Sequence, residues 1–485
     1  MTIKELEPSL VWKNFHALTQ IPRPSKKEAK AVEYLYRFGK SLGLETIKDE
    51  TGNIIIRKPA TPGMENRKGV ILQGHIDMVP QKNADKVHDF EKDPITTVVD
   101  GDWVRADGTT LGADNGLGVA VALSVLESKD LKHGPVEVLV TVDEETGMTG
   151  ANNLKPGVLK GDILINLDSE TEGELYVGCA GGIDATASLP YSLKQLQPGY
   201  KAFRIDAKGM KGGHSGMDIN LYRANANKVI ARVLVPLLRD HGVKLVSIDG
   251  GNMRNAIPRE AFAIVLVPEA SVAEVKELVS TVYKEVKAEY AATDPDLAIF
   301  FEDVPVTPSE YIEEEKALAF LRAVNVCPNG VWRMSDAVPG LVETSNNVAI
   351  VSSEGGAFHV KTLMRSSVDS EKAAIAEEFR SAFDLAGAVS EFTGGYSGWA
   401  PNSNSPILHT MKKVYKDLYG KEPAVMAIHA GLECGILGGK YPSWDMVSCG
   451  PTIMSPHSPD ERVNIPSVKK WWDFVTKVLE EIPQK

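Results

Sequence analysis

The chain has 485 residues, of which 43% are hydrophobic and 24% are charged, and its formal net charge is −12. This length and composition allow two folded domains and exclude a disordered chain. The negative charge argues against nucleic acid as a partner, and no apolar run reaches the roughly 20 residues that span a bilayer, so no membrane partner is expected.

The N-terminal stretch MTIKELEPSLVWKNF has no basic segment followed by an apolar one, so no signal peptide is predicted. The cysteines are scattered and form neither a CxxC pair nor a disulfide framework. They are Cys179, Cys327, Cys434 and Cys449. A reduced protein in the cytoplasm is therefore expected.

The first part of the chain, residues 1–184, alternates helix-like and strand-like patterns. An amphipathic helix is predicted at 27–43 and a further helix at 115–128. Apolar runs predict buried strands at 52–57, 69–73, 136–142 and 162–167. Buried strands between helices are typical of an α/β sheet that is covered on both faces.

The middle part, residues 185–396, has a different order of elements. The pattern predicts a strand at 202–207, a helix at 221–238, strands at 243–249 and 261–267, and a helix at 271–289. A similar order then recurs, with a strand at 298–303, a helix at 311–325, strands at 346–351 and 357–364, a helix at 370–386 and a strand at 388–393. Each half resembles the ferredoxin-like βαββαβ arrangement, so an inserted α+β domain of two such units is predicted.

The last part, residues 397–485, resembles the first part again. Helices at 406–418 and 467–481 enclose a short strand at 424–428, a helix that begins near 431 and the strand-like WDMVSCG. The chain is thus expected to leave an α/β domain with a mixed central sheet, build a second domain and return.

Histidine and carboxylate residues follow the predicted strands. His75 and Asp77 stand in GHIDMVP directly after a strand, where the histidine suits a metal ligand and the aspartate suits a group that orients it. Asp114 lies in a Gly-rich turn before an apolar helix. The alternatives, a turn histidine paired with a carboxylate and an ordinary aspartate N-cap, stay open for each motif alone.

The stretch VTVDEETG places Asp143, Glu144 and Glu145 at the end of a strongly apolar strand. Clustered carboxylates are costly there unless a cation is near, and adjacent glutamates allow one to bind metal while the other activates a water. Asp168 ends another strand, and His457 lies in the loop SPHSPDE. A solvated turn or a plain loop is the alternative for each.

Taken together, two histidines and three carboxylates make a two-metal site plausible. If Asp114 bridges, each metal has two further ligands, and a water can fill another bridging position. Histidine and carboxylate ligands with an open position suit Zn²⁺, and Mn²⁺ or Co²⁺ are acceptable substitutes.

These motifs resemble the two-zinc peptidase family that includes glutamate carboxypeptidase, aminoacylase and the bacterial dipeptidases. The resemblance covers nearly the whole chain, and the motifs occur in that family's order. It implies a zinc-peptidase catalytic domain with two Zn²⁺ per chain and Glu144 as the general base. It implies these metal ligands: His75, Asp114, Glu145, Asp168 and His457. Asp77 is implied as the carboxylate beside His75.

The same resemblance makes the inserted domain a lid. In KGGHSGMD, His214 would stabilise the oxyanion, and in GGNMRNAIPREA, Asn255 would contact the substrate. In TLMRSSVD, Arg365 would hold the substrate's terminal carboxylate, and Gly431 in HAGLECG would offer a backbone contact. From the residues alone, a surface arginine, a histidine in a Gly-rich turn and an asparagine that fixes a turn remain open.

Within this family, RKPATPGMENRKGV, DMVPQKN, VHDFEKDPI and GPTIMSPHSPDE look like the dipeptidases that cleave Xaa-His peptides. The implied activity is hydrolysis of such dipeptides by a metal-bridging water that Glu144 activates. A deacylase of N-acyl amino acids and a catalytically silent binding protein are the rival hypotheses. Some relatives require a homodimer because the lid serves a neighbour, whereas a two-unit lid would serve its own chain, so both states stay open.

Overall fold

The computed structural model describes residues 2–485, and the chain divides into two compact units. The first unit comprises Met1–Gly178, Pro401–Ala427 and Leu432–Lys485. The second unit comprises Cys179–Ala400 together with the short segment Ile428–Gly431. Among the described residues, no helix combines the length and the apolar character needed to cross a membrane.

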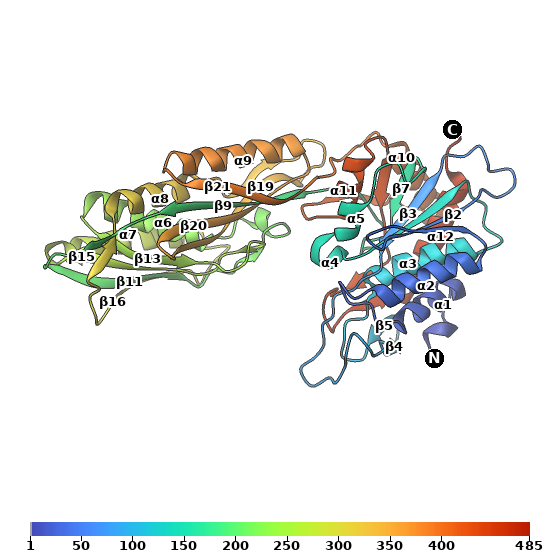
Figure 1. The fold of residues 1–485 in the computed structure, drawn as a ribbon, viewed down its shortest axis with the longest axis horizontal. Helices are drawn as coiled ribbons and strands as arrows, with labels where there is room; N and C mark the ends of the chain where they lie inside the picture. The colour runs from blue at the N-terminus through green and yellow to red at the C-terminus, as the bar shows by residue number, and fades with distance from the viewer. Residues whose placement is uncertain (1) are drawn as a thin grey trace. The chain divides into compact units, whose positions relative to one another are not determined.

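The first unit is built on an eight-stranded sheet (Figure 1). Its order is β1 (Glu45–Lys48), β2 (Ile54–Lys58), β6 (Val136–Thr141), β3 (Val70–His75), β7 (Ile163–Asn166), β23 (Asp445–Ser448), β8 (Glu174–Cys179) and β22 (Ala424–Ile428). The central strands β6, β3, β7 and β23 are parallel, whereas β1, β2 and β8 pair antiparallel. The sheet is therefore mixed, and its four apolar strands predicted from the sequence are present as β2, β3, β6 and β7.

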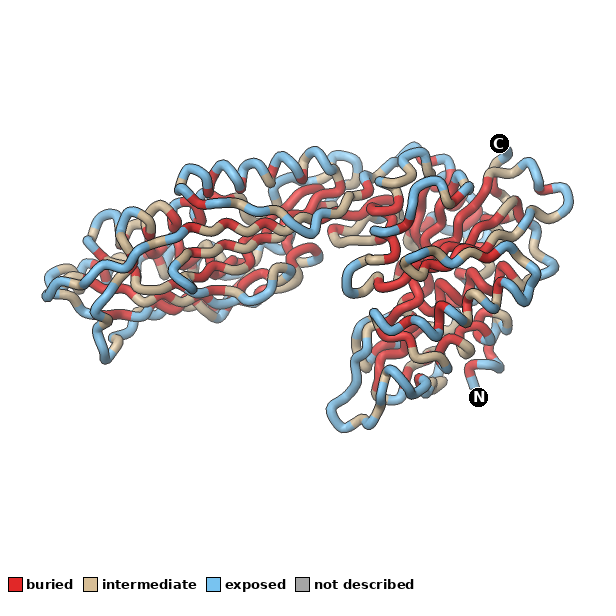
Figure 2. Tube along the Cα trace, in the orientation of Figure 1, coloured by how far each residue is buried: buried red, intermediate tan, exposed pale blue. Residues whose placement is uncertain are grey.

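Helices cover both faces of this sheet. The large apolar core lies on the face of Val70 and Leu72, against α1 (Ser9–Thr19), α2 (Ala29–Ser41), α3 (Ala113–Glu127), α10 (Pro406–Tyr419) and α12 (Ile465–Glu481). Side chains alternate along a strand, so Gln73 and His75 point to the opposite face, where α11 (Glu433–Lys440) and α5 (Thr149–Asn153) pack together. Figure 2 shows the buried trace that runs through the strands between these layers.

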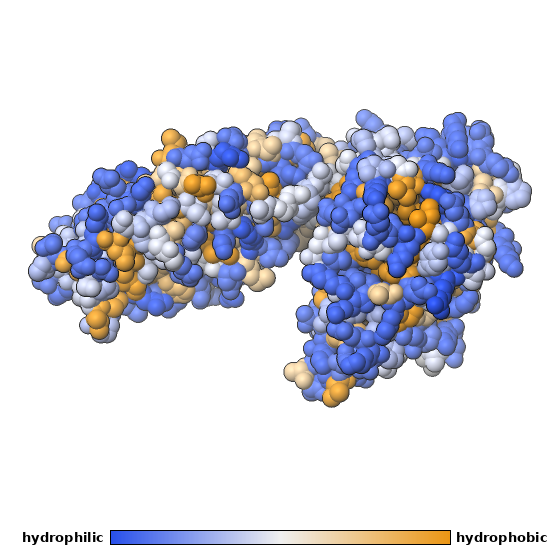
Figure 3. All heavy atoms as spheres, viewed as in Figure 1, coloured by the Kyte–Doolittle hydropathy of each residue, from blue (hydrophilic) through white to orange (hydrophobic). Residues whose placement is uncertain are grey.

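Shorter elements complete the first unit. The helix α4 (Glu144–Gly147) follows β6 directly. A separate four-stranded sheet has the order β24 (Ile453–Met454), β25 (Arg462–Asn464), β5 (Trp103–Ala106) and β4 (Thr97–Asp100). On the face drawn in Figure 3, hydrophilic side chains predominate over both units and the apolar ones are scattered.

The second unit is an antiparallel sheet covered on one face by helices (Figure 1). The strand order is β16 (Ala298–Asp303), β11 (Tyr200–Lys208), β15 (Ala261–Pro268), β13 (Lys244–Gly250), β19 (Val342–Glu354), β20 (Ala357–Ser366), β9 (Gly181–Pro190) and β21 (Val389–Tyr396), with β18 (Gly330–Met334) beside β19. The covering helices are α6 (Ala226–Asp240), α7 (Val272–Glu289), α8 (Glu314–Val326) and α9 (Asp369–Asp384). Their apolar side chains share one core with the sheet.

This sheet consists of two ferredoxin-like units, as the α+β prediction required, but the strands divide differently between them. The strand at 298–303 was expected to open the second unit. It is β16, which pairs with β11 and closes the first ferredoxin-like unit. The second ferredoxin-like unit opens with β9, which pairs with β20 and β21 and precedes the whole first ferredoxin-like unit in the chain. The first ferredoxin-like unit is thus inserted between β9 and α8, and the predicted start of the inserted domain at residue 185 lies inside β9. Pairing partners far apart in sequence decide this division, and single-strand patterns carry no information about them.

Candidate metal centre

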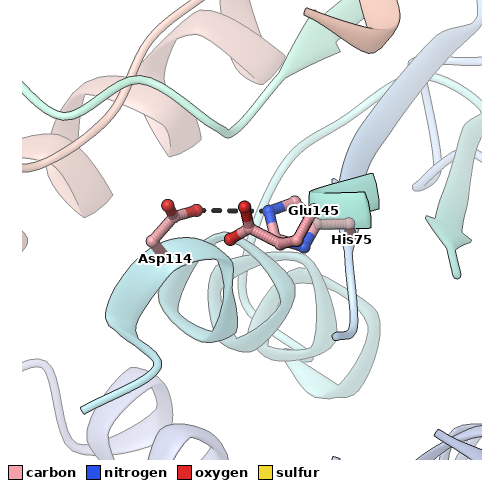
Figure 4. Close-up of side chains that lie close together, drawn as sticks. All are labelled: His75, Asp114 and Glu145. Carbon is pink, nitrogen blue, oxygen red and sulfur yellow. Dashed lines mark hydrogen bonds and ion pairs between the residues drawn. The ribbon is translucent and has the colours of Figure 1, made fainter. Parts of the chain in front are cut away.

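The two carboxylate oxygens of Asp114 face two different histidines. Asp114 Oδ1 lies 3.2 Å from His75 Nε2, and Asp114 Oδ2 lies 3.1 Å from His457 Nε2. Figure 4 shows Asp114 at the start of α3 and His75 at the end of β3 pointing toward each other, with Glu145 beside them. The N-cap position of α3 is held by Gly112 and not by Asp114, so the N-cap alternative does not describe Asp114.

A further carboxylate joins each histidine. Asp168 Oδ1 lies 3.3 Å from His75 Nε2, and Glu145 Oε2 lies 3.0 Å from His457 Nε2. Ligand atoms that each lie near 2.0 Å from a tetrahedral zinc ion are separated by about 3.3 Å. The spacings on both sides of Asp114 therefore resemble the edges of two coordination tetrahedra that share one carboxylate.

Some carboxylate oxygens of this cluster have no hydrogen-bond partner in the part of the chain that the structure describes. Glu145 Oε1 and Asp168 Oδ1 are buried and make no hydrogen bond within the described residues. Burial, together with the charges of Asp114 and Glu145, raises the pKa of Asp168 to about 7. Hydrogen bonds to Asp114 and Glu145 raise the pKa of His457 to about 11. Buried anions with free oxygens need a cation, and the donor set fits a pair of divalent ions.

The fold explains why these side chains meet. Glu145, His75 and Asp168 lie at or just beyond the carboxyl ends of β6, β3 and β7, which are adjacent and parallel. Parallel strands bring their carboxyl ends to one edge of the sheet, where open α/β sheets bind ligands. Gly112 precedes Asp114 with a left-handed backbone (φ 69°), and a Cβ there would lie 2.6 Å from the buried Arg23. Only glycine suits this turn.

Asp77 links His75 to the pair of glutamates. Its Oδ1 lies 3.3 Å from His75 Nδ1 and accepts a hydrogen bond from the Glu144 amide at 3.0 Å. Its Oδ2 accepts hydrogen bonds from the Glu145 amide at 3.2 Å and from the Ser25 hydroxyl at 2.8 Å. Burial alone would raise the pKa of Asp77, but His75 and the hydrogen-bond donors lower it to about 2. Asp77 is therefore ionised and able to orient the imidazole.

Glu144 begins α4, immediately before Glu145. Burial raises the pKa of the Glu144 carboxyl well above its usual value, and the neighbouring carboxylates of Asp168 and Glu433 add to this effect. A carboxyl group with a raised pKa beside a water-activating site suits proton transfer in both directions.

Two residues that shape the centre were missed from the sequence. The carboxylate of Glu461 is buried and accepts the backbone N–H groups of four consecutive residues. These donors are Leu111 and Gly112 on Oε2, at 2.7 and 2.9 Å, and Ala113 and Asp114 on Oε1, at 2.7 and 3.3 Å. Glu461 thereby holds the turn that carries Asp114. No local pattern marks a carboxylate that caps a turn more than 300 residues away.

Arg23 is the second missed residue, and it links the loop after His75 to the turn before Asp114. Its guanidinium is buried and donates to the carbonyl oxygens of Ile76 at 2.7 Å and Gly112 at 2.6 Å. One carbonyl follows His75, and the other precedes Asp114. In the sequence, Arg23 stands in the loop IPRP and carries no signal of this role.

In the second unit, His214 and Arg365 lie around Gly216. A Cβ on Gly216 would lie 3.2 Å from His214 Cε1, 3.3 Å from Arg365 Nε and 2.2 Å from the carbonyl oxygen of His429. The segment Ile428–Gly431, which contains the predicted contact Gly431, therefore borders the same place. Asn255 is exposed, and its carbonyl accepts a hydrogen bond from the Ser215 amide at 2.8 Å.

The His214 ring and the Arg365 guanidinium each offer a hydrogen-bond donor. Burial and the Arg365 cation lower the pKa of His214, so the ring is neutral. The amides of Gly216 and Met217 donate to His214 Nδ1 at 3.2 and 3.1 Å, which puts the proton on Nε2. Arg365 is buried, its Nε makes no hydrogen bond within the described part of the chain, and its Nη1 reaches the Tyr396 hydroxyl at 3.5 Å. These donors fit a polar or anionic ligand.

Comparison with known proteins places the chain in a family. The model of peptidase family M20/M25/M40 matches residues 71–481. The cytosol non-specific dipeptidase of Escherichia coli (strain K12) is 47% identical over 483 residues, which cover 100% of this chain and 99% of that protein. The crystal structure of aminoacylhistidine dipeptidase from Vibrio alginolyticus matches with a TM-score of 0.95 at 48% identity, covering 100% of this chain and 99% of that one.

A more distant structure shares the fold alone. The aminopeptidase PepT of Bacillus cereus matches with a TM-score of 0.58 at 15% identity, covering 98% of this chain and 99% of that one. The match to the family model spans most of the chain, and the relative at 47% identity is covered almost completely. This chain belongs to peptidase family M20/M25/M40.

Proposed function

We propose that this metal-dependent peptidase is a dipeptidase that acts on short peptides, with Xaa-His dipeptides as its preferred substrates. The observation that carries the proposal is the pair of ligand groups that share Asp114, each completed by one histidine and one further carboxylate. The names of the relatives at 47% and 48% identity, both dipeptidases, support the substrate class. A cytoplasmic location belongs to the same proposal, since the Escherichia coli relative is named a cytosol enzyme.

The cofactor we propose is a pair of Zn²⁺ ions per chain, with Co²⁺ or Mn²⁺ as substitutes. His75 and Asp168 would hold one ion, His457 and Glu145 the other, and Asp114 both. Such a pair, when bound, polarises the scissile carbonyl and makes a shared water acidic. The mixture of imidazole and carboxylate ligands is the chemistry that favours these metals.

Proton transfer falls to Glu144. Its carboxylate takes a proton from the attacking water and returns it to the amine that leaves. Burial raises the pKa of Glu144, which favours the carboxyl group as the proton carrier between the two transfers. Asp77 holds His75 in orientation during both steps, because it is ionised and fixed by the amides of Glu144 and Glu145.

Substrate binding would fall to the second unit, which we propose acts as a lid. The buried guanidinium of Arg365 has an unused donor and suits the terminal carboxylate of a peptide. The Nε2–H of His214 would donate to the carbonyl oxygen as negative charge develops on it. Asn255 and the backbone of Gly431 would add polar contacts, and a carboxylate clamp of this kind favours small substrates.

The proposal is tested with the full chain loaded with Zn²⁺ and a panel of Xaa-His dipeptides, other dipeptides, tripeptides and N-acetyl amino acids. We expect the highest kcat/KM for Xaa-His dipeptides and low values for tripeptides. A preference for N-acetyl amino acids would show a deacylase instead, and metal binding without amide hydrolysis would show a binding protein. Light scattering of the same sample distinguishes a monomer from the homodimer that the family allows.

A further inference from the structure

Glu433 is a buried carboxylate for which the reaction proposed above has no role. It begins α11, on the sheet face where His75 points, and none of its surface is exposed. Its Oε2 accepts hydrogen bonds from Gln73 Nε2 and from the Thr141 hydroxyl, each at 2.6 Å. Its Oε1 is buried and has no hydrogen-bond partner within residues 2–485.

The hydrogen bonds continue from Glu433 across the sheet. Gln73 Oε1 accepts from Asn166 Nδ2 at 2.6 Å, and Asn166 Oδ1 accepts from the Ser448 hydroxyl at 2.5 Å. Thr141, Gln73, Asn166 and Ser448 belong to the neighbouring strands β6, β3, β7 and β23. These hydrogen bonds form one connected polar row across the parallel strands at the centre of the sheet. Glu433 bonds directly to two of its members, Gln73 and Thr141.

Gln73 and Asn166 of this row lie one step below His75 and Asp168, whereas Thr141 lies level with His75. Gln73 lies two residues before His75 on β3. Asn166 is the last residue of β7 and lies two residues before Asp168. Residues two apart on a strand share a face, so Gln73 lies directly below His75. Thr141 pairs with His75 in the register of β3 and β6, and the Asp168 amide donates to Asn166 Oδ1 at 3.3 Å.

Stability alone does not explain a carboxylate at this place. A buried ionisable group costs free energy unless it is fully paired, and apolar side chains of similar volume are often as stable. Burial and the nearby acidic groups raise the pKa of Glu433 to about 7, which is a sign of this cost. The row connects β6, β3 and β7, the strands that end at or just before Glu145, His75 and Asp168, which indicates a role for Glu433 in positioning these residues.

We propose that Glu433 is a positioning residue for the metal centre. Its Oε2 fixes Gln73 and Thr141, and through Asn166 it fixes the end of β7, so that His75 and Asp168 are held in the orientation that binds metal. The proposal concerns hydrogen bonding, and it rests on the metal-dependent function proposed above. Groups that orient metal ligands typically change metal affinity about 10- to 100-fold when they are removed.

The test compares Glu433→Ala with Glu433→Gln. The Gln amide oxygen accepts two hydrogen bonds, so Glu433→Gln keeps both bonds and removes the charge. We expect Glu433→Ala to lower Zn²⁺ affinity at least about 10-fold in competition with a chromogenic chelator. We expect Glu433→Gln to stay within about 3-fold of the unchanged protein, because the positioning bonds remain. The visible absorption of the Co²⁺-loaded protein should change in Glu433→Ala and not in Glu433→Gln.

A matched control removes a buried hydrogen bond elsewhere in the same unit. The Ser124 hydroxyl accepts from buried Asn14 at 3.0 Å on the opposite side of the sheet, and Ser124→Ala should leave metal affinity unchanged. If Glu433→Ala does not fold, Thr141→Val removes one of the two bonds and should weaken Zn²⁺ binding to a smaller extent. Thermal denaturation of each variant shows whether its stability is comparable to that of the unchanged protein.

Three results would overturn the proposal. These are unchanged affinity in both Glu433→Ala and Thr141→Val, equal weakening in Ser124→Ala, and equal weakening in Glu433→Gln and Glu433→Ala. None of these measurements uses a peptide. A protein that binds metal with the expected order of affinities but cleaves no dipeptide would therefore contradict the proposed function and leave the role of Glu433 standing.

Discussion

Asp114 Oδ2 lies 3.1 Å from His457 Nε2, although the two residues are 343 positions apart in the chain. The other oxygen of Asp114 faces His75, so a single carboxylate contacts both histidines. Several consequences of this arrangement can be measured.

Removal of one terminal histidine should empty one of the two metal positions. In His457→Ala, the ligands on the His75 side remain, so bound Zn²⁺ should fall from about two ions per chain to about one. Elemental analysis after dialysis measures the ratio. His409→Ala, which changes an exposed histidine of α10, is the matched control and should keep both ions. Two ions in His457→Ala would contradict the ligand assignment.

Loss of the proposed general base should lower turnover without changing metal binding. Glu144→Ala leaves all five proposed ligands in place, so metal content should be unchanged while kcat falls about 10²- to 10⁴-fold. Steady-state kinetics with an Xaa-His dipeptide and elemental analysis of the same sample make the comparison. Near-normal turnover would exclude Glu144 as the base.

Glu461→Gln should weaken the turn that carries Asp114. An amide nitrogen replaces one of the two accepting oxygens, so two of the four backbone hydrogen bonds are lost. The new side-chain NH₂ group then faces backbone N–H groups, which are also donors. We expect unfolding free energy to fall by about 3 kcal/mol and metal affinity to fall about 10-fold. Chemical denaturation and chelator competition check the two effects. Unchanged affinity would mean that the turn keeps its shape without Glu461.

Arg365→Lys should affect substrate binding more than the chemical step. Lysine keeps the charge but loses the planar fork that binds a carboxylate in two places, so KM should rise about 10-fold with a smaller change in kcat. A dipeptide amide, which lacks the terminal carboxylate, should be a poor substrate for both proteins. Arg322→Lys, at an exposed position of α8, serves as the control. An equal rise of KM in the control would argue against the clamp.

The cysteines of the core should resist alkylation. Burial raises the pKa of both Cys327 and Cys449 to about 12, so these thiols stay protonated and unreactive at pH 8. The reactive thiolate would form only as the pH approaches 12, or when the chain unfolds. Mass spectrometry after iodoacetamide treatment, with and without denaturant, measures the difference. Rapid labelling of Cys327 in the folded protein would contradict its burial.

Local sequence patterns were sufficient to predict which residues follow the strands of the first unit. His75, Glu145 and Asp168 follow apolar runs that are strands in the structure, and parallel strands place their carboxyl ends at one edge. The sequence also indicated two ferredoxin-like units. It assigned strand 298–303 to the wrong one, because β16 finds its partner β11 across about 90 residues.

What the sequence determined by itself was the set of residue types at strand ends and turns, since hydrophobic periodicity and glycine positions act over a few residues. Only the tertiary structure decided that Asp114 turns one oxygen to each histidine, that Glu461 and Arg23 hold its turn, and that Glu433 lies below His75. The residues involved lie from 39 positions apart, for His75 and Asp114, to 360 positions apart, for Gln73 and Glu433. Their hydrogen bonds require the sheet to bring these distant segments together, so no local pattern records them.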